Sequence, residues 1–241
     1  MCFSSTASFT AAAGLVPLGL AACHLCRVRR QPQRLPLALT PLLFGVQQGL
    51  EGLVWQGLNA EGAGTGSGAG AAYGGPALLT AAMLGYLFFA LAFWLAWLPW
   101  CALRAGEGLL RGWRRTLVLG CLAAGLLLGL LLWLPLLWEP ARCSPAVVRG
   151  SIDYHCLLLG AGRIGHGLGS VLYGLTVGLP LLLSPLVRLR WFGVLILVAF
   201  AITQVFYLYA FSSVWCYFSA LLSMQVLWVV AEERKPTVEA G

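Results

Sequence analysis

Seven apolar runs dominate the sequence, and each has about the length of a helix that crosses a membrane. A helix of ~20 mainly apolar residues spans the hydrocarbon core of a bilayer. The last two runs share a nearly unbroken apolar stretch, Trp191 to Ala231, so we expect a turn near Phe211, Ser212 and Ser213. We predict an all-α, polytopic transmembrane helix bundle that forms a single domain over residues 1–241, with spans at 8–26, 36–57, 76–100, 116–138, 164–184, 191–209 and 213–231.

The composition supports this class. Hydrophobic residues make up 60% of the chain and charged residues only 10%, with a mean hydropathy of +0.85. That leaves too little polar surface to cover a soluble domain. We therefore expect the lipid bilayer to be the main partner of the chain, and nothing in the sequence favours nucleic acid as a partner.

The basic residues predict the orientation of the bundle, because Arg and Lys are retained on the cytoplasmic side during insertion. If the connecting segments alternate between sides, Arg142, Arg149 and Arg163 fall on one side of the membrane. The other side receives Arg27, Arg29, Arg30, Arg34, Arg104, Arg111, Arg114, Arg115, Arg188, Arg190, Arg234 and Lys235. We therefore expect the N-terminus outside and the C-terminus inside, which requires an odd number of spans.

A tract of Gly, Ala and Ser separates the second and third spans. It covers residues 61–76 and offers few side chains that can pack. We expect it to form a mobile outer loop.

Two of the eight cysteines, Cys143 and Cys156, fall in the predicted outer loop between the fourth and fifth spans. Disulfides persist in compartments outside the cytoplasm. Twelve residues lie between the two cysteines, and Pro140 and Pro145 can turn the chain nearby. We predict that this pair is a disulfide candidate, with two unpaired thiols as the alternative.

Glu51 is the only acidic residue within the predicted spans. A charged side chain at the centre of a bilayer costs ~2.5–3.5 kcal/mol on insertion scales, so such a residue rarely persists without a role. Gln48, Glu51 and Trp55 recur at helical spacing, and Gln47 lies one turn below Glu51. We predict that this polar face looks into the bundle, where the Glu51 carboxylate finds a partner or stays protonated.

Other polar and aromatic residues are expected at the same outer depth. The combined set predicts an outward-facing ligand pocket lined by Gln47, Gln48, Glu51, Trp55, His155, Arg163, His166, Gln204, Tyr207, Trp215 and Cys216. Simpler interpretations remain open: glutamines can join helices by hydrogen bonds, and aromatic residues at helix ends form membrane belts. His166 can equally be a solvated residue in the first turn of its helix.

The sequence does not identify a cofactor. Three histidines in the chain, with no His pair at i, i+4 spacing, make a metal site unexpected. The seventh span contains no lysine, which excludes retinal bound there through a Schiff base.

Four stretches resemble one uncharacterised, largely bacterial family of multi-helix membrane proteins with an opening Met-Cys-Phe-Ser signature. They are MCFSSTASF at 1–9, QQGLEGLVW at 47–55, SIDYH at 151–155 and SVWCYF at 213–218. The resemblance extends from the N-terminus through the seventh span. It implies a multi-pass protein of the bacterial plasma membrane, and it implies no activity.

Three classes of function remain open. The leading hypothesis is a binding protein whose small-molecule or lipid-head-group ligand contacts Glu51, His155, His166 and Trp215. The first alternative is a proton- or cation-coupled transporter that uses Glu51. The second is a membrane-embedded enzyme with Glu51 or His166 as acid or base and Cys216 as nucleophile, although no triad spacing supports it.

Overall fold

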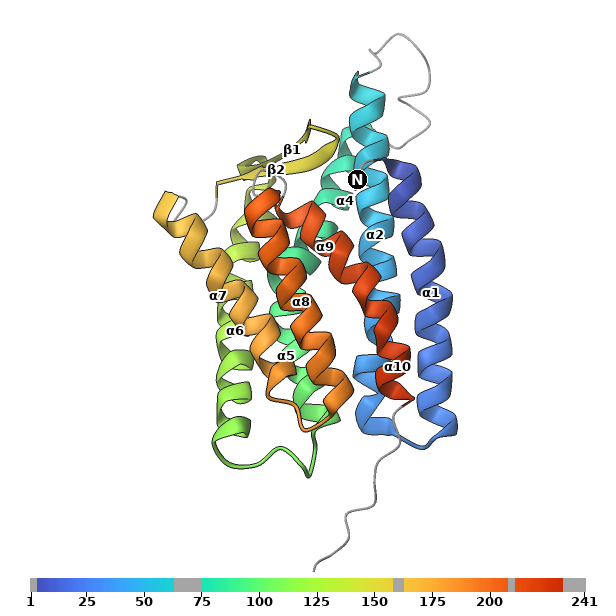
Figure 1. The fold of residues 1–241 in the computed structure, drawn as a ribbon. Coiled ribbons are helices and arrows are strands. Elements are labelled where there is room, and N and C mark those ends of the chain that lie inside the picture. The colour runs from blue at the N-terminus through green and yellow to red at the C-terminus, as the bar shows by residue number, and fades with distance from the viewer. Residues whose placement is uncertain (1–3, 63–74, 158–162, 208–210, 232–241) are drawn as a thin grey trace, which may run out of the picture.

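The protein is a bundle of helices with a small β-hairpin over one end (Figure 1). Its computed structural model describes residues 4–62, 75–157, 163–207 and 211–231, without the side chains of residues 61–62 and 163–168. Within these residues, six helices are long and apolar enough to cross a membrane, and a seventh, shorter apolar helix covers Gly169–Leu182. The main helices are α1 (Ser5–Val28), α2 (Leu35–Gly62), α4 (Gly75–Phe88), α5 (Trp94–Ala105), α6 (Gly112–Trp138), α7 (Arg163–Leu182), α8 (Val187–Phe206), α9 (Phe211–Leu222) and α10 (Val226–Val230).

These helices confirm the predicted all-α bundle and follow the order of the seven predicted spans. The third span consists of α4 and α5, and the last consists of α9 and α10 joined by the 3-10 turn η5 (Ser223–Gln225). Several boundaries differ from the prediction: α2 ends at Gly62 rather than at 57, and α8 begins at Val187 rather than at 191. Residues 211–213 form the start of α9 rather than a turn. Residues 63–74 of the predicted outer loop lie outside the described residues.

The segment after α6 forms an antiparallel hairpin, where the sequence predicted only a loop. Strand β1 (Cys143–Val148) pairs with β2 (Ser151–Cys156), in a register that runs from Cys143 opposite Cys156 to Val148 opposite Ser151. The connecting residues Arg149 and Gly150 both have positive φ angles, of 49° and 76°. Positive φ at both central positions is the pattern of the two-residue turns that match the twist of paired strands.

A π-helical turn, η2 (Phe89–Phe93), interrupts the third span between α4 and α5. Such a turn inserts an extra residue and so changes which side chains face the neighbouring helices. Trp94 follows directly, and its side chain is buried toward α2. The apolar sequence FALAF gives no sign of this turn.

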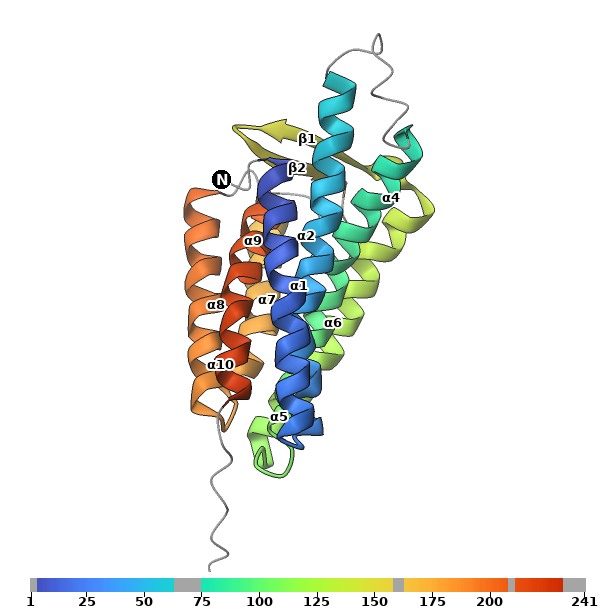
Figure 2. The same cartoon turned by 90° about the vertical axis from the view of Figure 1, so that its right-hand side faces the viewer.

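The buried apolar side chains form two main groups along the bundle. The larger group joins α1, α2, α5, α8 and α10. A smaller group lies beneath the hairpin and includes Trp55 of α2, Tyr86 of α4, Ile152 of β2 and Cys216 of α9. In both views the hairpin crosses the end of the bundle beside α2, and α2 extends past it (Figures 1 and 2). We call this the hairpin end.

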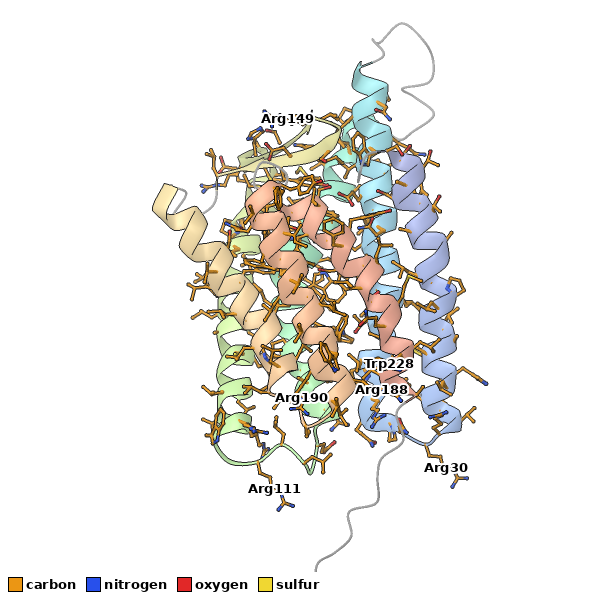
Figure 3. The ribbon with its side chains drawn as sticks, viewed as in Figure 1. Arg30, Arg111, Arg149, Arg188, Arg190 and Trp228 are labelled. Atoms are coloured by element: carbon orange, nitrogen blue, oxygen red, sulfur yellow. A yellow bond between two sulfur atoms is a disulfide. The ribbon has the colours of Figure 1, made fainter. Side chains whose placement is uncertain are left out.

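The opposite end carries many of the basic residues, and we call it the basic end. Arg30, Arg111, Arg188 and Arg190 lie there, whereas Arg149 lies at the hairpin turn (Figure 3). These positions agree with the predicted topology, which places Arg149 on one side of the membrane and the other four arginines on the opposite side.

Three arginines donate hydrogen bonds to carbonyl groups at the end of the last span. Arg29 donates to the carbonyl oxygen of Ala231 at 2.6 Å, and Arg188 donates to that of Trp228 at 2.7 Å. Arg34, which is completely buried, donates to the carbonyl oxygen of Val229 at 3.3 Å. Carbonyls at a helix C-terminus have no partner within the helix, and basic side chains there satisfy both the hydrogen bonds and the helix dipole.

Close packing between α5 and α6 depends on glycine. A Cβ atom at Gly125 would overlap the carbonyl oxygen of Leu95, whereas a Cβ at Gly120 of the same helix would meet nothing within 4 Å. We expect Gly125→Ala to lower the free energy of unfolding by ~1–3 kcal/mol, the usual cost of overpacking. Thermal unfolding in detergent would measure this effect.

Gly120→Ala is the matched control for that substitution. It makes the same change on the same helix, and we expect it to leave the melting temperature equal or slightly higher because Ala favours helices over Gly. Equal melting temperatures for the two variants would contradict the close approach of α5 and α6.

Candidate functional site

Glu51 lies on α2 and is completely buried. Its Oε1 accepts a hydrogen bond from Ser213 Oγ of α9 at 2.5 Å, and its Oε2 accepts one from Gln48 Nε2 at 3.2 Å. Both donors are neutral. Among the described residues the ion pairs involve Glu107, Glu139 and Asp153, so Glu51 has no basic partner there.

One turn below Glu51, Gln47 joins α2 to α5. Gln47 is completely buried, and its Oε1 accepts a hydrogen bond from Trp94 Nε1 at 2.7 Å. The indole ring of Trp94 stacks on Phe44, with ring centroids 3.8 Å apart. This aromatic pair closes the polar region on the side toward the basic end.

Two tyrosines and a cysteine complete the surroundings of Glu51. Tyr86 of α4 donates to the carbonyl oxygen of Ser212 at 3.0 Å, and its ring stacks on Tyr154 of β2 with centroids 4.9 Å apart. The Cys216 thiol of α9 lies beside the Tyr86 hydroxyl and the Gln47 amide, within electrostatic reach of Glu51.

We call these residues together the Glu51 cluster. It comprises Gln47, Gln48, Glu51 and Trp55 of α2, Tyr86 of α4, Trp94 of α5, Tyr154 of β2, and Ser213 and Cys216 of α9.

Several polar atoms of the Glu51 cluster are buried without a hydrogen-bond partner among the described residues. They are Gln47 Nε2, Gln48 Oε1, Trp55 Nε1 and the Tyr154 hydroxyl. A buried donor or acceptor without a partner costs ~1–3 kcal/mol, and most such groups in folded proteins are satisfied by protein or by bound water. The cluster therefore offers both donors and an acceptor to a small polar guest.

The hairpin covers the cluster. Alternation along β2 buries Ile152 and turns the Tyr154 ring onto Tyr86, and a disulfide joins Cys143 to Cys156 at the open end of the hairpin. Burial raises the pKa of the Tyr154 phenol well above its ordinary value, and the nearby Glu51 and Cys216 raise that pKa further. The phenol is thus a neutral hydrogen-bond donor within electrostatic reach of Glu51.

Asp153 and His155 occupy the other face of β2. Their side chains pair at 3.1 Å, and the His155 side chain is 64% exposed. Burial raises the pKa of the Asp153 carboxyl, and His155 partly offsets this effect. His155 therefore lies outside the Glu51 cluster, although the sequence predicted it in the pocket.

The other predicted pocket residues also lie apart. Trp215 packs against Phe200 and Phe211 in an aromatic group between α8 and α9. Tyr207 packs near Val214, and Gln204 of α8 is half-buried. The side chains of Arg163 and His166 lie outside the described residues.

The structure brings together five of the predicted residues: Gln47, Gln48, Glu51, Trp55 and Cys216. Tyr86, Trp94 and Ser213 were not among the predicted site residues, and Tyr154 was not among the predicted ligand-binding residues. A tyrosine within the apolar third span was one available signal for Tyr86. No group of three or more His, Cys, Asp or Glu residues within the described part of the chain is arranged to hold a metal ion.

A family model described as a family of unknown function, DUF6629, matches residues 1–240. The chain belongs to this family. The match covers almost the whole chain and agrees with the resemblance to an uncharacterised family. No curated protein and no solved structure matches the chain.

The hydrogen bond between Gln47 and Trp94 gives a direct test of the cluster. We expect Gln47→Leu to lower the free energy of unfolding by ~1–3 kcal/mol, because it leaves the buried Trp94 N–H without a partner. Gln204→Leu is the matched control, since Gln204 Oε1 accepts no hydrogen bond from the residues that the structure describes. Equal melting temperatures for the two variants would contradict the bond.

The disulfide provides a second test, which asks whether it holds the hairpin in place over the Glu51 cluster. The bridge joins cysteines that are 13 residues apart. Closing a loop of this size stabilises a folded protein by about 3 kcal/mol in the chain-entropy model. We expect the double variant Cys143→Ser, Cys156→Ser to melt at a lower temperature and to exchange amide hydrogens faster in β1 and β2.

Cys121→Ser is the control for the loss of a thiol, because Cys121 is an unpaired cysteine of α6. Unchanged hydrogen exchange in the hairpin of the double variant would show that the disulfide does not hold the cover in place.

Proposed function

We propose that this protein is a membrane binding protein that holds a small polar molecule or a lipid head group at the Glu51 cluster. The observation that carries the proposal is the Glu51 carboxylate, which is completely buried and whose only hydrogen-bond donors among the described residues are the neutral groups of Ser213 and Gln48. Buried charges in proteins are normally paired. A guest with a positive charge or several hydrogen-bond donors would supply the missing partner.

The chemistry around Glu51 defines the kind of guest. Gln48 Oε1 offers an acceptor, and Trp55 Nε1 and the Tyr154 hydroxyl offer donors. Stacked Tyr86 and Tyr154 add aromatic surface next to the carboxylate. A carboxylate beside aromatic rings suits an amine or quaternary ammonium group, which both features attract. A small amine with a neighbouring hydroxyl or carbonyl group fits this set of partners.

The alternative of a coupled transporter is less well supported. Transport requires a path from the cluster to the opposite end of the bundle. Below Gln47 the stacked rings of Phe44 and Trp94 are 2% and 3% exposed and fill the interior with apolar surface. The stack favours a site that is reached from the hairpin end only.

The alternative of an enzyme is also less well supported. Its nucleophile would be Cys216, which is buried beside neutral Tyr86 and Gln47. A reactive thiolate is usually found next to basic groups, which lower its pKa. The described surroundings of Cys216 contain no such group.

The proposed setting is the plasma membrane of a bacterium, with the hairpin end outside the cytoplasm. The bias of basic residues toward the other end supports this orientation. The disulfide in the hairpin supports it as well, since such bridges persist outside the cytoplasm. The bilayer is the proposed partner of the apolar helix surfaces.

Native mass spectrometry of the purified protein tests the binding proposal even though the guest is unidentified. We expect a co-purifying small molecule on the wild type and a loss of about tenfold or more in its occupancy on Glu51→Gln, because a charge-assisted hydrogen bond contributes ~1.5–3 kcal/mol. The mass of the released molecule would identify it.

Glu107→Gln is the matched control, because Glu107 is an exposed acid at the end of α5 paired with Arg104. It makes the same chemical change away from the cluster. The occupancy of the bound molecule on this variant should equal the occupancy on the wild type. Identical bound species on wild type and Glu51→Gln, with equal melting temperatures, would refute the proposal.

A further inference from the structure

A groove of about 430 Å³ opens between α8 and the last span, away from the Glu51 cluster. It is lined by Trp191, Leu195, Gln225 and Trp228. Trp191 and Leu195 lie on α8, and Gln225 and Trp228 lie on the last span, so these two elements (Figure 1) form the sides of the groove.

Arg188 supplies a positive charge at one end of the groove. Arg188, Trp191 and Leu195 recur at i, i+3 and i+7 on α8, so they share one face of the helix. The Arg188 guanidinium lies 4.7 Å from the ring centroid of Trp228 and donates to the Trp228 carbonyl oxygen at 2.7 Å. These two contacts hold the guanidinium in place. Its other N–H groups make no hydrogen bond to the described residues and can donate to an anion.

An exposed apolar track continues from the groove toward the hairpin end. On α8 it includes Val198, which is 48% exposed, and on the last span Leu221 and Met224, which are 41% and 53% exposed. Arg188 and Val198 are ten residues apart, or ~15 Å along a helix. That length is about half the ~30 Å hydrocarbon core, which is the depth of one lipid leaflet.

We propose that this groove is a specific site for an anionic phospholipid. The phosphate binds the Arg188 guanidinium, the Gln225 amide bonds to the glycerol ester region, and one acyl chain follows Leu195, Val198 and Leu221. Charge complementarity selects a lipid with a net negative head group, and the tryptophans on both sides match the preference of indole rings for the membrane interface. This site is separate from the Glu51 cluster and does not depend on the function proposed for it.

Arg190 provides a control on the same helix. It is exposed at the same end of α8, but it lies two residues from Arg188 and so points to a different face of the helix, as the labelled side chains show (Figure 3). Arg188 and Arg190 contribute the same charge to the basic end. Of these two arginines, Arg188 is the one that contacts Trp228 at the edge of the groove.

The test is native mass spectrometry of delipidated protein in an equimolar mixture of phosphatidylglycerol and phosphatidylcholine with identical acyl chains. We expect the wild type to retain phosphatidylglycerol preferentially. Arg188→Gln should lower the retained phosphatidylglycerol about tenfold, the effect of losing a charge-assisted bond. Arg190→Gln should retain as much as the wild type.

Leu195→Trp keeps Arg188 and fills the groove, so it should lower retention as strongly as Arg188→Gln does. If Arg188→Gln does not fold, Leu195→Trp decides alone: loss of phosphatidylglycerol supports the site, and full retention overturns it. Equal losses in Arg188→Gln and Arg190→Gln would overturn it in favour of attraction by the summed charge of the basic end. A wild type without preference between the two lipids would overturn it as well.

Discussion

The need to pair every polar group inside the protein, because lipid offers no hydrogen bonds, governs this structure. It explains why the described segments that are long and apolar enough to cross a bilayer are helices, whose backbone hydrogen bonds are internal. It also explains the partners found for polar side chains on neighbouring spans, such as Trp97 Nε1 donating to Thr40 Oγ1 at 3.2 Å. The β-hairpin lies across one end of the bundle, so the unpaired edges of its strands are at the ends of the apolar helices and not among them.

Against this background the Glu51 cluster is exceptional. It concentrates a carboxylate, two amides, two phenols and a thiol in one buried region, and several of these groups have no partner among the described residues. An apolar replacement would be more stable in the same place, because unpaired buried polar atoms lower stability. Departures of this kind from good packing are expected at functional sites. The cluster occupies one level of the bundle. It lies between the stacked rings of Phe44 and Trp94 on one side and the hairpin on the other.

The sequence was sufficient to predict the spans and the position of Glu51, because both follow from periodicity and hydropathy along single helices. It was not sufficient to predict which residues meet Glu51. Ser213 is 162 residues away in sequence, and its contact with Glu51 depends on how α9 packs against α2. The π turn before Trp94 and the positive φ angles at Arg149 and Gly150 are likewise set by local geometry that an apolar or mixed sequence does not reveal. The sequence predicted His155 in the pocket, but alternation along β2 places its side chain on the face opposite to Tyr154, where it pairs with Asp153.

The arginines at the end of α10 have a consequence for how the protein is made. Arg29 follows α1, Arg34 precedes α2 and Arg188 begins α8, yet all three bind carbonyl groups in the last residues of the final span. During synthesis these guanidinium groups emerge long before the carbonyls that they bind. The three hydrogen bonds span 202, 195 and 40 residues of sequence, so none of them can form until the last span has been synthesised.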